Sequence, residues 1–274
     1  MAGCPFGYTV EVWGLVRTNM AAKERNPSST RSYSAMSDAL GPDDIDVVFQ
    51  PIVDLRTRQL FALEALVRCT AYGLSSPPVL FEHAVKHDYA GRLGRMIREI
   101  TVGRCPGIPI FTNVHPNELS QRWLVRPDDP IFSHDTDVYI EITEAVPFSH
   151  YEHCVSVLRE LRSRGRVHLV IDDLGAGFSN LKRIVDLHPK IVKLDIELVR
   201  GIDTEPRQRS LVRSIVAMCK EQGAHVVAEG IEQPDELSAV IDAGVQYGQG
   251  FLLARPAFPV PAVSWPPGVA RRGG

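Results

Sequence analysis

Residues 167–179 read VHLVIDDLGAGFS, and the fold class is inferred from this segment outward. Its first five residues, Val167–Ile171, form a short apolar run with β-branched side chains, which is typical of a buried strand. Two carboxylates and a glycine-rich segment follow. A helical pattern precedes the run at Tyr151–Arg164, and another apolar run follows at Ile191–Leu194. A strand between helical segments, ending in acidic residues, indicates an α/β protein.

The same alternation extends over most of the 274 residues. Further helical patterns occur at Glu205–Gln222 and Pro234–Ala243. The alternation predicts a TIM-like (β/α)₈ barrel rather than a doubly wound sheet. The eight expected strands are Val47–Val53, Leu60–Val67, Ile108–Val114, Val138–Ile142, Val167–Ile171, Ile191–Leu194, His225–Ala228 and Tyr247–Leu252.

The connection between the first two expected strands differs from the others. Only about six residues, from Asp54 to Gln59, separate them, which is too short for a parallel crossover. The pair must therefore be a hairpin, and the first strand of the barrel is expected to be antiparallel.

We assign the barrel to residues 41–258. Residues 1–40 lack sustained periodicity and are interpreted as a poorly ordered extension with a short strand near Tyr8–Val16. Residues 259–274 form a proline-rich tail that is expected to be irregular.

Composition narrows the classes of protein and partner. A formal net charge of −3 gives no sign of a surface for duplex nucleic acid. No apolar run approaches the roughly 18 residues of a membrane helix, so no membrane partner is expected. The five cysteines include no CxxC pair, which argues against zinc and favours a reducing, cytoplasmic location.

Polar residues recur where the expected strands end. The carboxyl ends of barrel strands meet at one mouth, where active sites lie. A single carboxylate there has about an even chance of merely capping a helix or pairing with an arginine, but seven strands with such residues favour a cation site. Oxygen ligands without His or Cys favour Mg²⁺ or Mn²⁺. The residues are Glu64, Asn113, Glu141, Asp172, Asp173, Lys193, Asp195, Glu229 and Gln249.

Arginines recur at every third position at Arg92, Arg95 and Arg98. A solvent-exposed helix face is the expected explanation, in preference to an anion site.

Several of these segments together resemble the EAL-domain family of cyclic di-GMP phosphodiesterases. The likeness covers about residues 44–258, and its ordered motifs are specific to that family. The segments are Glu64-Ala-Leu-Val-Arg68, Asn113-Val-His-Pro116, Glu141-Ile-Thr-Glu144, Asp172-Asp-Leu-Gly-Ala-Gly-Phe-Ser179, Lys193-Leu-Asp195, Ala228-Glu-Gly-Ile-Glu232 and Gln249-Gly-Phe251. After Arg68 the chain departs from the family's usual aromatic-x-His-Pro segment.

The resemblance implies roles for the matching residues. The implied metal ligands are Glu64, Asn113, Glu141, Asp172 and Glu229, with Asp173 and Asp195 at a second metal. Lys193, together with Glu64, Glu229 and Gln249, is implied in catalysis, with Lys193 beside the attacking water. Arg68, Leu66, Gln50 and Asp195 are implied at the substrate. Glu144 is implied to hold the loop Asp173–Ser179, which in the family links metal binding to dimerisation.

The expected reaction is metal-dependent hydrolysis of cyclic di-GMP to linear pGpG by a homodimer, with two Mg²⁺ or Mn²⁺ ions. Lys193, if partly buried beside these cations, is expected to have a lowered pKa. Two alternatives remain. One is a receptor that binds cyclic di-GMP without cleaving it. The other is an interaction module that acts through residues 1–40, although these lack a long amphipathic helix.

Overall fold

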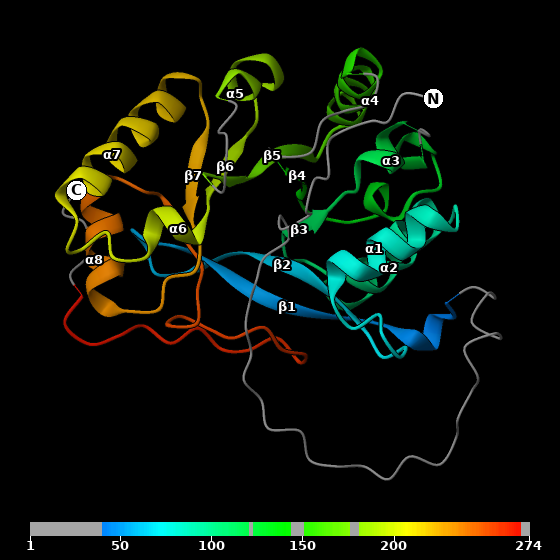
Figure 1. Ribbon diagram of the computed structural model, residues 1–274, viewed down its shortest axis with the longest axis horizontal. Coiled ribbons are helices and arrows are strands. Elements are labelled where there is room, and N and C mark those ends of the chain that lie inside the picture. Colours follow the sequence, from blue (N-terminus) through cyan, green and yellow to red (C-terminus); the bar gives the residue numbers. More distant parts are fainter. Residues whose placement is uncertain (1–39, 121–122, 144–150, 176–180, 270–274) are drawn as a thin grey trace, which may run out of the picture.

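The structure is a closed eight-stranded barrel surrounded by helices (Figure 1). It is a computed structural model that describes residues 40–120, 123–143, 151–175 and 181–269. The TIM-like barrel predicted from sequence is confirmed. Its strands are β1 (Ile45–Asp54), β2 (Leu60–Cys69), β3 (Ile110–Asn113), β4 (Val138–Thr143), β5 (Val167–Leu174), β6 (Ile191–Leu194), β7 (His225–Ala228) and β8 (Tyr247–Gly248).

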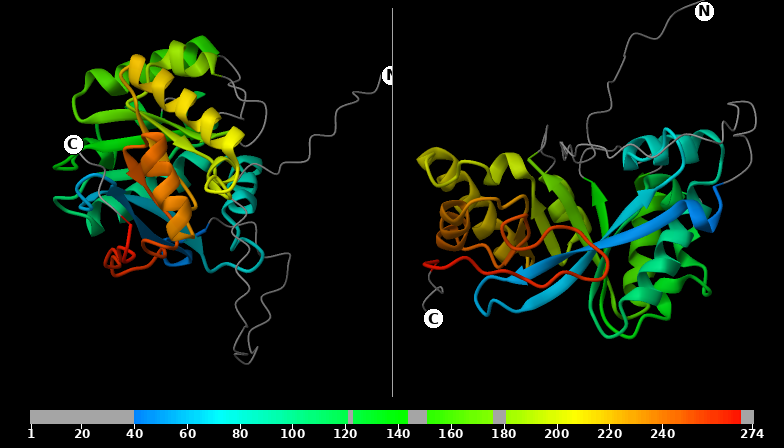
Figure 2. Two further views of the ribbon diagram at one scale, coloured as in Figure 1. Left: turned by 90° about the vertical axis from the view of Figure 1, so that its left-hand side faces the viewer. Right: turned by 90° about the horizontal axis from the view of Figure 1, so that it is seen from below.

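Strand β1 runs antiparallel to both of its neighbours, β2 and β8, and every other pair of neighbouring strands is parallel. The predicted hairpin is therefore confirmed. Its turn is stabilised by the Asp54 side chain, which accepts hydrogen bonds from the backbone N–H groups of Arg56 and Thr57. Arg58 then adopts a left-handed conformation with φ of 66°. In Figure 2 the long β1–β2 ribbon passes between two groups of helices.

The helices lie outside the strands (Figure 1). Three of them, α4, α7 and α8, agree with the helical patterns of the sequence to within one residue at each end. The helices are α1 (Pro77–Lys86), α2 (Ala90–Arg104), α3 (Pro116–Ser120), α4 (Tyr151–Ser163), α5 (Lys182–Leu187), α6 (Ile196–Val199), α7 (Pro206–Glu221) and α8 (Pro234–Ala243), with short 3₁₀ segments η2 (Pro42–Asp44), η3 (Trp123–Val125) and η4 (Pro130–Phe132).

Strand β8 is shorter than the expected Tyr247–Leu252, so that part of the prediction is wrong. After Gly248 the chain turns back on itself, and the Leu253 and Ala254 N–H groups both donate to the Gly250 carbonyl. The turn is close to the backbone of Ile231, which donates to the Gln249 carbonyl.

Two large apolar clusters fill the space between strands and helices, one around β1–β4 and one around β6–β7. No helix within the described ranges is long and apolar enough to cross a membrane. The expected strand near Tyr8–Val16 lies outside the described residues, and the assigned domain boundaries stay predictions.

Candidate active site

The barrel interior has two layers. The apolar layer is a separate cluster with one buried residue from each of β1 to β7, against which Phe61 of β2 and Tyr247 of β8 pack. The buried residues are Ile52, Ala62, Phe111, Tyr139, Val170, Ile191 and Val227. Side chains two positions apart share a face of a strand. The residues two positions nearer the mouth are all polar: Gln50, Glu64, Asn113, Glu141, Asp172, Lys193, Glu229 and Gln249. The period of two thus stacks a polar layer directly on an apolar floor.

Lys193 lies at the centre of the polar layer, with 1% of its side chain exposed. Its Nζ is 2.6 Å from Glu229, 2.7 Å from Glu141, 3.1 Å from Asp172 and 3.3 Å from Glu64. Burial opposes the charged form, but Asp172 and the other carboxylates outweigh it, so the pKa of Lys193 is raised well above its ordinary value. The lowered pKa expected for Lys193 beside cations stays a prediction, because the charged groups that raise the pKa here are all carboxylates.

Asp172 and Asp173 point toward the same site although they are adjacent in β5. The β5–β6 register shifts between Ile171 and Leu174, and Asp173 has a φ of 57°. A regular strand would send the two side chains to opposite faces. Because of this bulge, oxygens of Asp172, Asp173 and Glu229 lie within 4.8 Å of one another. Burial and the neighbouring Asp172 raise the pKa of Asp173 to about 8.

These groups fit a cation site. We call Glu64, Glu141, Asp172, Asp173 and Glu229 the carboxylate cluster. Among the described residues, all ion pairs of the cluster go to Lys193. An ammonium has three N–H donors, so Lys193 cannot donate a full hydrogen bond to each of the four carboxylates that lie within 3.3 Å of its Nζ. Burial raises the pKa of Glu141 and Glu229 well above the ordinary value, as expected where negative charge lacks compensation.

Asn113 joins the cluster through Glu141. Its amide donates to Glu141 Oε2 at 3.0 Å, and the next residue, Val114, donates its backbone N–H to the Glu141 carbonyl. Strands β3 and β4 place these two residues in register. An amide oxygen adds a ligand without adding charge, which suits a cluster already rich in carboxylates.

A chain of amides lies beside Glu64. Gln249 donates to Glu64 Oε2 and to Gln50 Oε1, and Gln50 donates to the Ala254 carbonyl. All three side chains are buried. Gln249 therefore orients the carboxylate of Glu64, and Gln50 orients Gln249.

Gly250 allows the close approach that this arrangement needs. A Cβ at position 250 would overlap the backbone N, C and O of Ile231. Gly250→Ala is expected to lower the free energy of unfolding by about 1–3 kcal/mol and to displace Gln249. Chemical denaturation measures the change.

Gly103→Ala is the matched control, because Gly103 is exposed in α2 and a Cβ there meets nothing within 4 Å. It should raise stability by about 0.5–1 kcal/mol. Equal stability of the two variants would contradict the role of Gly250.

The remaining predicted site residues lie around this centre. Leu66 and Arg68 follow Glu64 at intervals of two in β2, and Arg68 is exposed, with Nη1 donating to the Val67 carbonyl. Asp195 follows β6 and caps α6 by accepting from the Glu197 N–H. The Asp195 carboxylate is close enough to Asp173 to raise its pKa. Glu144 lies outside the described residues.

Sequence reasoning did not single out Arg183. This arginine of α5 is buried and donates from Nη1 to the Thr143 carbonyl at the end of β4. No motif or spacing in the sequence distinguishes it from an exposed helical arginine.

Comparison with known proteins agrees with the barrel fold. A family model described as "EAL domain" matches residues 34–256. Cyclic di-GMP phosphodiesterase PdeR of Escherichia coli is 30% identical over 241 residues, which cover 83% of this chain and 36% of PdeR. This chain thus spans about a third of that relative's length.

Two solved structures are similar. One is a manganese and cyclic di-GMP complex of Klebsiella pneumoniae BlrP1, with 29% identity and a TM-score of 0.66, covering 78% of this chain and 56% of that chain. The other is a standalone EAL protein from Vibrio cholerae O395 in its c-di-GMP bound form, with 26% identity and a TM-score of 0.66, covering 81% of this chain and 96% of that chain.

Proposed function

Because the chain belongs to the EAL domain family, we propose that it hydrolyses cyclic di-GMP to linear pGpG with divalent cations at the mouth of the barrel. The observation that carries the proposal is the carboxylate cluster around one buried ammonium. Without cations, this cluster would repel an anionic substrate. The named complexes of the similar structures support the choice of substrate and of a divalent metal.

Glu64, Asn113, Glu141, Asp172, Asp173 and Glu229 would hold the cations, for which we propose two Mg²⁺ or Mn²⁺ ions. When bound, the cations neutralise phosphoryl oxygens and lower the pKa of water. We propose that Asp195, whose carboxylate influences the pKa of Asp173, contributes to the second site or to the substrate.

The carboxylates around Lys193 raise its pKa and favour the ammonium form. We therefore propose that it donates hydrogen bonds to the attacking water and to the developing phosphoryl charge, and that it does not act as a base. We propose that a carboxylate accepts the proton and that this carboxylate is Glu229, which lies 2.6 Å from Lys193 Nζ. Gln249 holds Glu64 in place.

The substrate would lie against β1 and β2 at the mouth. We propose that Arg68, which is exposed on the same strand as Glu64, binds a phosphate of the substrate. Leu66 lies between them on the same face and offers apolar contact, and Gln50 borders the site through Gln249.

We expect the purified chain to convert cyclic di-GMP to pGpG when Mg²⁺ or Mn²⁺ is added after chelation. Ca²⁺ should bind but support little turnover, because it acidifies water less effectively. Chromatography of the nucleotides measures the products. Full activity of a rigorously metal-free sample would refute the cation mechanism. Binding of cyclic di-GMP without any product would favour a receptor instead.

We also propose a cytoplasmic homodimer in which Glu144 controls the loop that begins at Asp173. The cytoplasmic location, the homodimer and the role of Glu144 stay predictions.

A further inference from the structure

Arg98 is a buried cation outside the cluster at the mouth. The regular spacing of Arg92, Arg95 and Arg98 predicted a solvent-exposed helix face, and this is wrong for Arg98, whose side chain is 1% exposed. Arg92 is exposed, as predicted, and Arg95 is half-buried. A helix turn takes 3.6 residues, so side chains at intervals of three residues gradually move around the helix axis. Arg98 therefore points toward the side of α2 that lies against the barrel, whereas Arg92 points to solvent.

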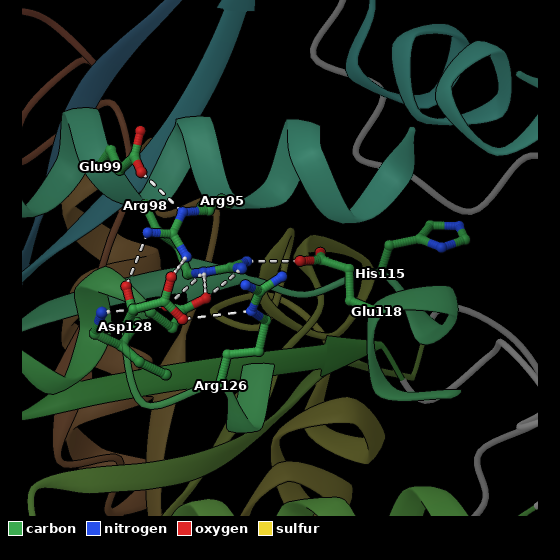
Figure 3. A network of polar contacts seen from close by, with 9 residues as sticks. Arg95, Arg98, Glu99, His115, Glu118, Arg126 and Asp128 are labelled. Carbon is green, nitrogen blue, oxygen red and sulfur yellow. Dashed lines mark hydrogen bonds and ion pairs between the residues drawn. The ribbon is translucent and has the colours of Figure 1, made fainter. Parts of the chain in front are cut away.

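Arg98 forms a network with two carboxylates. Its Nη1 donates to Glu118 Oε2 at 2.6 Å, and its Nη2 and Nε donate to Asp129 at 2.8 Å and 3.1 Å. The side chains of Glu118 and Asp129 are 0% and 2% exposed. Figure 3 shows Arg98 reaching from α2 toward Glu118, with Arg95 and Asp128 at the edge. We call Arg98, Glu118 and Asp129 the arginine network.

The network fastens the backbone that follows Asn113. Glu118 Oε1 accepts from the His115 N–H at 3.2 Å, two residues after Asn113. The His115 ring lies parallel to Phe81 at 5.8 Å, and its Nδ1 accepts from the Asn117 N–H. Burial lowers the pKa of His115, which favours the neutral ring that this hydrogen bond requires. On the side of strand β4, the Asn113 amide and the Val114 N–H donate hydrogen bonds to Glu141.

The second carboxylate fixes the segment that leads to β4. Asp129 accepts from the Ile131 N–H and so caps η4, a few residues before the strand that carries Glu141. Arg98 thereby connects the turn after β3 with the approach to β4. These neighbouring strands supply the two bonded site residues Asn113 and Glu141.

Burial of the three charged side chains of the arginine network carries a desolvation penalty. Apolar residues of similar volume often stabilise a fold as well as a buried ion group does. Gly94 of α2 also lies so close that a Cβ there would overlap the Glu118 carboxylate. Unlike apolar residues, the guanidinium and the two carboxylates form directional hydrogen bonds, which fix the geometry of the backbone segments that they contact.

We propose that Arg98 is a positioning residue that acts through Glu118 and the His115 backbone to fix Asn113 for cation binding. The inference rests on the proposed function only in requiring that the mouth binds divalent cations. It needs neither turnover nor a particular substrate.

Calorimetric titration of the chelator-treated full chain with Mn²⁺, without nucleotide, tests the proposal. Arg98→Met should raise the Mn²⁺ Kd by about tenfold or more, the effect typical of residues that orient metal ligands. Glu118→Gln should do the same, since it keeps an oxygen for His115 but loses the acceptor for Arg98. Arg95→Gln is the matched control, because Arg95 lies one turn away in α2 and pairs with Glu99 and Asp128 at the surface; its Kd should not change.

A double-mutant cycle with Asn113→Ala separates positioning from general stability. If Arg98 acts through Asn113, Arg98→Met should change the Kd by less than about twofold when Asn113 is already alanine. A merely structural role would weaken binding equally in both backgrounds.

Equal loss in the two backgrounds, or an unchanged Kd in a folded Arg98→Met variant, would overturn the inference. If Arg98→Met does not fold, the same cycle with the isosteric Glu118→Gln decides. Absence of Mn²⁺ binding by the unmodified chain would instead refute the cation site, so the two failures are distinguishable.

Discussion

Lys193→Met is expected to lower kcat by about 10²-fold or more while leaving the affinity for cyclic di-GMP largely unchanged. Methionine keeps an unbranched side chain of similar length but removes the only ammonium that the described residues place among the carboxylate cluster. In the proposed mechanism, the ammonium of Lys193 stabilises the charge that develops on the phosphoryl group as water attacks. Loss of the ammonium therefore affects the transition state more than the bound substrate. Single-turnover hydrolysis and calorimetric binding measure the two effects separately.

Lys190→Ala is the control for this prediction, because Lys190 is exposed and lies just before the same strand. It should retain normal turnover. Normal hydrolysis by Lys193→Met, or a failure caused only by lost binding, would remove Lys193 from the proposed mechanism without removing the enzyme.

The Lys193 variant should also be less stable when metal-free. Removing one partner of a buried ion pair typically costs about 3–5 kcal/mol, because the remaining charge stays buried. Added Mg²⁺ should restore part of the loss by compensating the carboxylates. Denaturation with and without Mg²⁺ checks this expectation.

Glu64→Gln is expected to weaken cation binding by at least the roughly 10–100-fold typical of outer ligand contacts. The variant keeps the shape of the side chain but loses one negative charge. Glu64 accepts from Gln249 through Oε2 and from Lys193 through Oε1, and a glutamine retains only one of these two acceptors. Raising the Mn²⁺ concentration should therefore recover part of the activity of Glu64→Gln, whereas it should recover none of the activity of Lys193→Met. Turnover across a Mn²⁺ titration distinguishes the two variants.

Glu82→Gln serves as the matched control, since Glu82 is exposed on α1. It should have the Mn²⁺ dependence of the unmodified chain. An identical Mn²⁺ dependence of Glu64→Gln would show that Glu64 is not a ligand.

The sequence predicted the barrel because its signals were local and periodic. Apolar β-branched runs identified the strands, and the short connection from Asp54 to Gln59 identified the antiparallel strand. Polar residues at strand ends indicated the mouth, since topology alone brings those ends together. The identity of Lys193 as a site residue was predictable for the same reason.

What the sequence did not predict depends on tertiary contacts. The bulge at Asp173 arises from the pairing of β5 with β6, and the early end of β8 from the approach to Ile231. The burial of Arg98 follows from how α2 packs, which an interval of three residues does not encode. The pKa of Lys193 depends on four carboxylates from four other strands or strand ends, whose distances no motif contains.

The apolar layer determines the route by which water and ligands reach the polar layer. Phe111 and Tyr139 stack at 4.4 Å, Phe61 and Tyr247 stack at 4.0 Å, and these rings belong to or pack against the cluster that lies under the polar layer. A dry plug of this kind gives water no passage from the opposite end of the barrel. Under the proposed function, substrate, attacking water and product share one entrance, so each product leaves before the next substrate binds. We therefore expect residues at this entrance, Arg68 among them, to influence the rate of product release as well as the affinity for substrate.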